Sequence, residues 1–324
     1  MLCFDIEATN LGATVPNQRK DDGRPIRIRR RVGSGLVLPA TAFSVVLVAL
    51  CGVMVYIGVR ISRADRQSDG MLKWERGTES DVVVGRPLDG EEVYPAVLKS
   101  TTLIVGQQGF GSGVLVHASR RLVLTNNHVV ESNGSITVFF ASSDSKGILK
   151  SQPSQYLRVR PDPGISAKVV SQDQLKDLAL LELSTLPSDA EPIPLATQPA
   201  ATGSKLHSIG SSGLNPENLS GTLWRMTSGE TRGRNEQNMA ARSGGKVGRV
   251  NAMLLESQKP NNPGDSGGPT VNAAGGLVGL VCMLDRSRDA VSLDIDLVEI
   301  ERFLKNYATQ NGWVWNGRRM EMKR

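Results

Sequence analysis

The most informative segment of this chain is Asn261-Asn262-Pro263-Gly264-Asp265-Ser266-Gly267-Gly268-Pro269, because it combines a serine with closely spaced glycines. Glycines let a backbone turn tightly around a serine and aim two N–H groups at one point, where a developing oxyanion can be held. Ser266 is therefore the candidate nucleophile, and the N–H groups of Gly264 and Ser266 form the candidate oxyanion hole. Taken alone, the string would also suit a surface turn, so its meaning depends on residues further upstream.

Two upstream segments contain the partners that a serine nucleophile requires. Leu124-Thr125-Asn126-Asn127-His128-Val129-Val130 supplies His128 as candidate general base, and Asp177-Leu178-Ala179-Leu180-Leu181 supplies Asp177 as the carboxylate that orients it. Asp173 is a competing carboxylate, but it sits in polar sequence, whereas Asp177 adjoins an apolar strand. The order histidine, aspartate, serine is the one associated with chymotrypsin-like double barrels.

At these three segments, and at Gly109-Phe110-Gly111-Ser112-Gly113, the chain resembles the trypsin-like clan and, within it, the HtrA (Deg) serine proteases. The resemblance covers roughly residues 94–303 and implies peptide-bond hydrolysis through an acyl-enzyme, without a cofactor. It also implies protein or peptide substrates, damaged proteins among them. HtrA relatives often carry a PDZ domain next, but residues 308–324 are too few for one, so we expect none.

Asp265 departs from the HtrA pattern, which usually has asparagine at this position. Trypsin-like enzymes have an aspartate there, and it pairs with a freshly cut N-terminus. A domain tethered at its front offers no such amine, so the sequence leaves open how the charge of Asp265 is satisfied.

Beyond Tyr94, short apolar runs alternate with turn residues, which predicts an all-β domain. We expect two antiparallel six-stranded β-barrels of the chymotrypsin-like type, joined by a bridge over 192–199 and followed by a C-terminal helix over 296–307. The 34 glycines and the few aromatic residues fit short strands and tight turns. The twelve predicted strands are 103–105, 114–116, 122–124, 136–140, 168–170, 178–183, 206–209, 221–227, 253–256, 270–271, 277–283 and 291–295.

The chain of 324 residues also has room for extensions around this domain. The predicted segments are a basic cytoplasmic arm (1–31), a single transmembrane signal anchor (32–60), a polar linker (61–93), the trypsin-like domain (94–308) and a basic C-terminal tail (309–324). Residues 32–59 carry no charge, and a helix over Leu36–Val59 would be about 36 Å long. That length is enough to cross a bilayer core of about 30 Å.

A cleaved signal peptide fits residues 32–60 less well, because the apolar run is too long and no Ala-x-Ala-like site follows it. The bulky Leu50 argues against lipoprotein processing at Cys51. An arginine cluster at 27–31 favours a cytoplasmic N-terminus, and therefore an extracytoplasmic protease domain. The asymmetry is imperfect, since three arginines follow the span at 60, 63 and 66.

Composition excludes several other classes of protein. The net charge is +6, and the basic stretch 225–249 lacks the interleaved aromatic residues that nucleic-acid binding needs. No His, Cys and carboxylate cluster has metal-ligand spacing, so we expect no metal site.

Of the three cysteines only Cys282 falls in the protease domain, which therefore has no internal disulfide. The glycine run at 109–113 lacks the spacing of a phosphate loop and predicts a tight strand pair instead.

The substrate pocket is predicted from the residues on either side of Ser266, with Pro260, Cys282 and Met283 as lining residues. The stretch 257–262 contains no acidic residue, and 280–283 is apolar, so small or medium aliphatic side chains are favoured over Lys or Arg. Asp285 is the exception that would favour a basic side chain.

Together these features predict a membrane-anchored serine endopeptidase, and an oligomer is compatible with the sequence. A membrane-tethered pseudoprotease or protein-binding module is the alternative, because Asp265 and an unusual insertion at 233–247 depart from the family pattern.

Overall fold

The structure, a computed structural model, describes residues 89–107, 109–131, 134–157, 164–215, 218–243, 246–285, 291–315 and 320–322. All of them belong to one compact unit of the chain. The predicted arm (1–31), transmembrane anchor (32–60) and most of the linker lie outside the described residues. No helix within the described ranges has both the length and the apolar character needed to cross a membrane.

Six antiparallel strands form a first closed barrel in the order β1-β2-β3-β6-β5-β4. The glycines of β2 lie in a tight strand pair, as predicted, because Gly113 pairs with Thr102 of β1 and a Cβ on Gly113 would lie only 2.7 Å from the Thr102 hydroxyl. The barrel interior is filled by aliphatic residues from alternate strand positions, such as Leu115 and Leu181. The strands are β1 (Thr101–Val105), β2 (Phe110–His117), β3 (Leu122–Thr125), β4 (Ile136–Phe140), β5 (Ile165–Asp173) and β6 (Leu178–Leu183).

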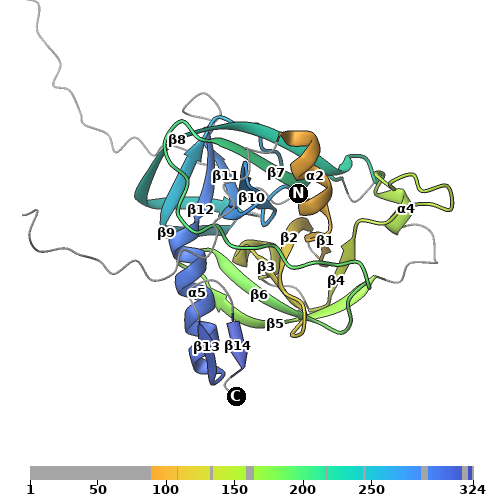
Figure 1. Cartoon of the computed structure of the whole chain (residues 1–324), viewed down its shortest axis with the longest axis horizontal. Helices are drawn as coiled ribbons and strands as arrows, with labels where there is room; N and C mark the ends of the chain where they lie inside the picture. The colour runs from red at the N-terminus through yellow and green to blue at the C-terminus, as the bar shows by residue number, and fades with distance from the viewer. Residues whose placement is uncertain are drawn as a thin grey trace, which may run out of the picture. The chain divides into compact units, whose positions relative to one another are not determined.

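A second closed barrel follows, in the order β10-β11-β12-β9-β8-β7. Figure 1 shows it above the first barrel in that view. All twelve strands predicted from the sequence are therefore confirmed, and the two-barrel prediction with them. The strands are β7 (Lys205–Ser212), β8 (Thr222–Ser243), β9 (Lys246–Ser257), β10 (Pro269–Asn272), β11 (Leu277–Asp285) and β12 (Val291–Asp296).

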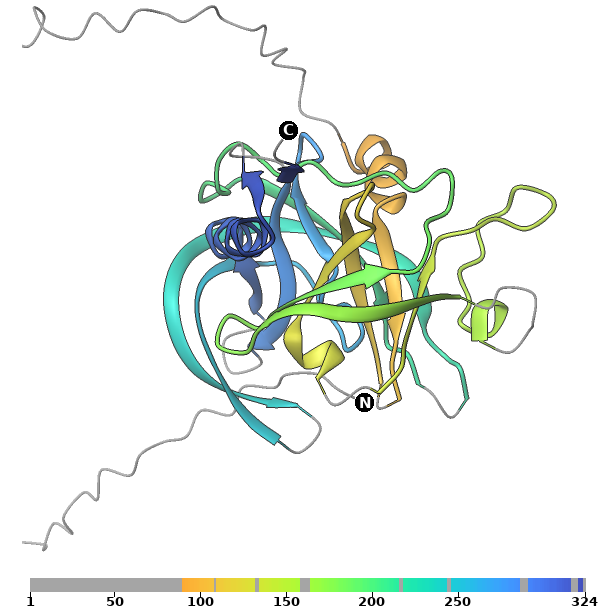
Figure 2. The same cartoon turned by 90° about the horizontal axis from the view of Figure 1, so that it is seen from below.

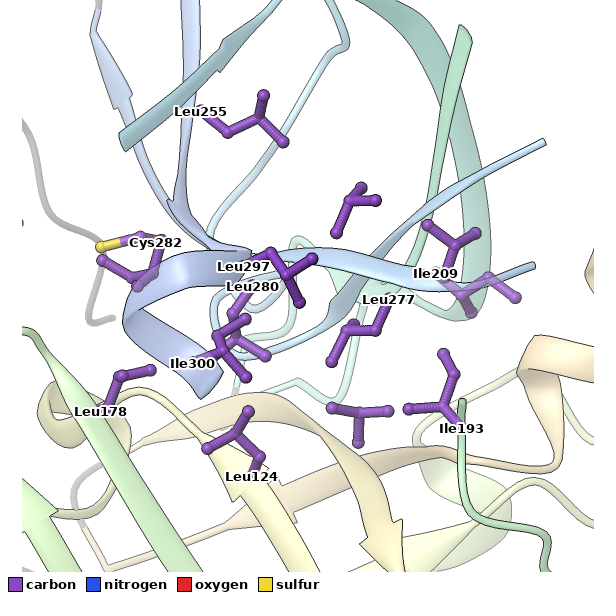
Figure 3. Packing of buried hydrophobic residues seen from close by; sticks show 14 of the residues in the cluster. Leu124, Leu178, Ile193, Ile209, Leu255, Leu277, Leu280, Cys282, Leu297 and Ile300 are labelled. Carbon is purple, nitrogen blue, oxygen red and sulfur yellow. The ribbon is translucent and has the colours of Figure 1, made fainter. Parts of the chain in front are cut away.

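The two barrels share one hydrophobic core. Figure 3 shows Leu124 and Leu178 of the first barrel close to Leu280 of the second and to Ile300 of the C-terminal helix. The bridge between the barrels is held by both of them. Within it, the Ile193 N–H donates to a carbonyl of β2 at 2.9 Å, and Leu195 forms an isolated bridge with β11.

Helix α5 (Leu297–Gln310) confirms the predicted C-terminal helix and extends it by three residues. Asp296 is its N-cap, and the Asp296 side chain accepts a hydrogen bond from the Val298 N–H at 3.0 Å. The predicted tail contains a two-stranded hairpin of β13 (Trp313–Trp315) and β14 (Met320–Met322). Three short helices were not predicted from the sequence, namely α2 (Gly90–Leu98), α3 (Asn127–Val130) and α4 (Ser154–Leu157).

Helix α2 begins inside the segment predicted as a linker. Asp89 caps it by accepting hydrogen bonds from two backbone N–H groups, and the side chain of Glu92 returns a bond to the Asp89 N–H. This is a capping box, which satisfies the N–H groups that a helix start leaves free. Ordered structure therefore starts at least four residues before Tyr94.

Strands β8 and β9 extend beyond the barrel as a two-stranded ribbon. β9 pairs with β12 only from Leu254 to Ser257, whereas its pairing with β8 continues to the Ser243↔Lys246 pair. We call residues 236–243 and 246–253 the ribbon. Figure 2 shows it curving away along the outside of the second barrel. The insertion predicted at 233–247 therefore lies largely in this ribbon.

Candidate functional site

The site is built from the ends of strands in both barrels. Strand β3 ends at Thr125 and passes into the short helix α3, which carries His128. Asp177 immediately precedes β6, in the turn that follows β5. Ser266 lies in the turn between β9 and β10. The three side chains are 2%, 2% and 3% exposed, so the site is shielded from solvent.

His128 and Asp177 are joined by two hydrogen bonds. The imidazole Nδ1 of His128 lies 2.8 Å from Oδ2 of Asp177, and the His128 backbone N–H donates to Oδ1 at 2.9 Å. The side-chain amide of Asn126 donates to the Asp177 carbonyl oxygen at 3.0 Å, which fixes the backbone of the aspartate as well. A carboxylate on Nδ1 leaves Nε2 as the nitrogen that can accept a proton from a hydroxyl.

The competing carboxylate, Asp173, has a different role in the structure. Its Oδ1 accepts a hydrogen bond from the Lys176 N–H at 2.9 Å, within the turn that leads to Asp177. Asp173 therefore shapes the turn, and Asp177 is the carboxylate that contacts the histidine.

Cys282 connects Ser266 with Asp177. The Ser266 hydroxyl donates to the Cys282 carbonyl oxygen at 3.2 Å, and the Cys282 thiol donates to Asp177 Oδ2 at 3.1 Å. The thiol is buried and is directed at the carboxylate, although the sequence predicted this residue as pocket lining. Sequence reasoning missed the contact because a cysteine inside an apolar strand pattern resembles a core residue.

The turn that carries Ser266 is fixed to both barrels. The Gly213 N–H donates to the Pro263 carbonyl oxygen at 2.7 Å, and the hydroxyl of Ser112 donates to the Gly264 carbonyl oxygen at 2.8 Å. Gly264 has φ +98°, and a Cβ there would lie 2.1 Å from the Ser211 carbonyl oxygen. Only glycine fits this position. Among the described residues, neither the Gly264 N–H nor the Ser266 N–H donates to a protein acceptor, so both donors are available to a ligand.

Asp265 is buried in this turn and is held by side chains of the same barrel. The Ser212 hydroxyl donates to it at 2.7 and 2.8 Å, and the Asn262 N–H donates at 2.8 Å. Arg225 donates from Nε to Ser212 Oγ at 2.9 Å, and its Nη2 lies 3.6 Å from the carboxylate. Burial raises the pKa of Asp265, while the bonds from Ser212 and Asn262 and the charge of Arg225 act in the opposite direction.

A second buried ion pair lies beside the predicted pocket. Lys259 Nζ lies 2.8 Å from Asp294 Oδ2, and both side chains are fully buried. The Thr270 hydroxyl also donates to this carboxylate, at 2.8 Å. The negative charge of Asp294 is thus already neutralised. Of the other predicted lining residues, Pro260 is exposed. Met283 lies in β11, where it pairs with Leu293 of β12, and its side chain is outside the described part of the structure.

Within the described ranges, no group of three or more His, Cys, Asp or Glu side chains is arranged to hold a metal ion. The groups that the site brings together are a hydroxyl, an imidazole, a carboxylate and backbone N–H groups. Two closed barrels with these groups at their strand ends define the chymotrypsin-like class of proteins.

Comparison with known proteins agrees with this class. The profile of the family described as "Trypsin-like peptidase domain" matches residues 111–280, and the chain belongs to that family. It is 30% identical over 203 residues to Protease Do-like 1, chloroplastic, from Arabidopsis thaliana, covering 59% of this chain and 39% of the relative. It is 29% identical over 210 residues to the periplasmic serine endoprotease DegP of Salmonella typhimurium, covering 63% and 37%.

The chain spans less than two fifths of the length of these two curated relatives. Among solved structures, the active form of the Rv3671c protease from M. tuberculosis superposes with a TM-score of 0.51 at 23% identity, covering 65% of this chain and 82% of that one. This likeness supports the fold. The resemblance to HtrA-type proteases expected from the sequence is confirmed.

Proposed function

We propose that this chain is a serine endopeptidase in which Ser266 attacks the peptide carbonyl and His128 accepts the proton of Ser266. Asp177 holds the imidazole tautomer and stabilises the imidazolium, and the N–H groups of Gly264 and Ser266 stabilise the oxyanion. The observation that carries the proposal is the doubly bonded His128–Asp177 pair, linked to Ser266 through Cys282. The similarity to relatives that include a periplasmic serine endoprotease supports it.

Substrate preference is proposed to be for small or medium aliphatic residues at the cleavage site. A basic side chain in a closed pocket needs a free carboxylate, because an unpaired buried charge costs several kcal/mol. Asp294, a buried carboxylate that contacts the predicted pocket-base stretch 257–262, is already paired with Lys259. This pairing removes an anchor that Arg or Lys would otherwise use.

The proposal is tested with matched peptides that carry Val or Arg at the cleavage position, using the full chain and its Ser266→Ala variant. We expect hydrolysis of the Val peptide, at least about tenfold slower hydrolysis of the Arg peptide, and no turnover of either by the variant. Preference for Arg would refute the pocket assignment. Equal turnover by the variant would remove Ser266 from the mechanism.

We further propose that residues 32–60 anchor the enzyme in a membrane with the protease domain on the extracytoplasmic side. The uncharged run and the preceding arginine cluster support this proposal. Damaged or misfolded proteins are the proposed natural substrates, by resemblance to the HtrA type. The alternative, a tethered pseudoprotease or binding module, predicts that no peptide is cleaved.

A further inference from the structure

The turn that places Asp177 has a strained backbone. Asp177 has φ +52°, in the left-handed region that residues other than glycine rarely adopt. Such a conformation is unfavourable and persists only where the surroundings impose it. The surroundings that impose it on residues 173–177 therefore also determine where the Asp177 carboxylate lies.

Glu299, in the first turn of α5, is a buried carboxylate that contacts this turn. It is 4% exposed, and its Oε1 accepts hydrogen bonds from Lys176 Nζ at 3.1 Å and from the Met253 N–H at 3.0 Å. Its Oε2 accepts from Arg302 at 2.7 Å. One carboxylate thus joins the residue next to Asp177, strand β9 and helix α5.

The ribbon makes a second contact with the same turn. The backbone N–H of Asn251 donates to the Leu175 carbonyl oxygen at 2.8 Å. Asn251 lies beyond the part of β9 that pairs with β12, so this bond depends on the ribbon extending past the barrel. Residues 175 and 176 are therefore each held by a group from the C-terminal half of the chain.

We propose that Glu299 is a positioning residue for Asp177, and that Glu299 and the ribbon together hold the turn from which Asp177 reaches His128. Glu299 contacts neither His128 nor Ser266 in the described structure, so it acts through Lys176 and the turn. The proposal rests on the proposed function, in which Asp177 orients the catalytic imidazole.

The test compares Glu299→Met, Glu299→Gln and Lys176→Met in the full chain, with Glu301→Met as a control on the same helix. Glu299→Met removes the acceptor, whereas Glu299→Gln keeps an oxygen for Lys176 and the Met253 N–H. Because misplacing a group in an active site by about 1 Å can cost about 100-fold, we expect kcat to fall roughly 10- to 100-fold in Glu299→Met and Lys176→Met. KM should stay within about twofold, Glu299→Gln should be intermediate, and Glu301→Met should match the wild type.

A second readout does not depend on turnover. We expect the proton shared between His128 Nδ1 and Asp177 to give a far-downfield proton NMR resonance in the wild type, and this resonance to be lost or broadened in Glu299→Met and Lys176→Met. Wild-type kcat with an unchanged resonance in both variants would overturn the proposal. If Glu299→Met does not fold, Lys176→Met decides the question alone. If the wild type itself shows no turnover, the proposed function fails, and the resonance still tests the positioning role.

Discussion

At the scale of single residues, Asp265 shows how the domain accommodates a carboxylate in the turn of Ser266. The carboxylate is held by Ser212 and, through it, by Arg225, both from strands of the same barrel. This relay holds the Asp265 carboxylate with groups of one barrel, while Ser112 of the other barrel holds the Gly264 carbonyl oxygen. A cost remains, because burial outweighs these partners and raises the pKa of Asp265.

This cost gives a pH-dependent prediction for Asp265→Asn. Burial raises the pKa of Asp265 above its ordinary value in the folded chain, so the folded state binds the proton more tightly than the unfolded state. Stability contributed by this group is therefore complete below the unfolded pKa and is lost as the pH rises through the raised pKa. We expect the variant to be more stable than the wild type at about pH 7.5, and to lose that advantage near pH 4.

Urea unfolding at the two pH values measures the effect, with the exposed Asp189→Asn as control. The control should change little at either pH. If Asp265→Asn were destabilising by the same amount at both pH values, the hydrogen bonds to the carboxylate would outweigh its burial.

The sequence identified His128, Asp177 and Ser266, because each stands in a short segment whose residue types serve a chemical need. It could not identify Ser212, Arg225 or Glu299 as their supports. Ser212 and Arg225 lie roughly 30 to 60 positions before the motif that they serve, and Glu299 lies on helix α5, far along the chain from Asp177. Nothing in the local sequence of these residues differs from that of an ordinary strand or helix surface. Only the packing of the two barrels brings them to the site.

At the scale of elements, strands with a buried face were predictable and the ribbon was not. Eleven of the twelve barrel strands contain buried apolar residues, and β5 packs half-buried ones against the core, so each strand has a clear apolar pattern in its sequence. The two strands of the ribbon pair only with each other, and β8 contributes mainly polar or small residues to it at 236–243. At its base Val250 and Ala252 are buried in the core, but residues 236–239 are exposed or half-buried and show no apolar alternation, so the sequence indicated an insertion without indicating strands.

The ribbon gives a prediction about activity. Joining Gln237 to Ala252 by an Asn-Gly turn deletes the ribbon tip and the Asn251 N–H, but leaves the pairing of β9 with β12 intact. One hydrogen bond contributes about 0.5–1.5 kcal/mol, so we expect kcat to fall between about twofold and about tenfold. Thermal unfolding should shift by only a few degrees.

A shorter deletion is the matched control for the ribbon. Joining Ala240 to Arg249 in the same way keeps Asn251 and its bond to Leu175. This variant should retain wild-type kcat. Equal losses in the two deletions would show that the ribbon acts through its tip, and would contradict the role given to Asn251.

At the scale of the whole molecule, the two-barrel arrangement places the residues of the site at the ends of strands from different barrels. The shared core, with α5 packed against it, fixes the relative position of His128 and Ser266. The proposed anchor would attach this unit to a membrane. It is supported by the sequence of residues 32–60 and has its own test.

Membrane fractionation tests the anchor directly. Because a spanning helix resists extraction, we expect the full chain to stay in the membrane pellet after an alkaline carbonate wash. A chain that begins at Asp69 should appear in the soluble fraction. Release of the full chain by carbonate would contradict a spanning segment at residues 32–60.

Labelling with a fluorophosphonate probe tests most directly whether Ser266 is an activated nucleophile. The full chain is labelled, and the adduct is mapped by mass spectrometry. A serine reacts with such a probe only when a neighbouring base activates it. We predict one adduct, on Ser266, which is absent from Ser266→Ala and strongly reduced in His128→Ala. An unlabelled wild type, or equal labelling of the Ser266→Ala variant, would contradict the account.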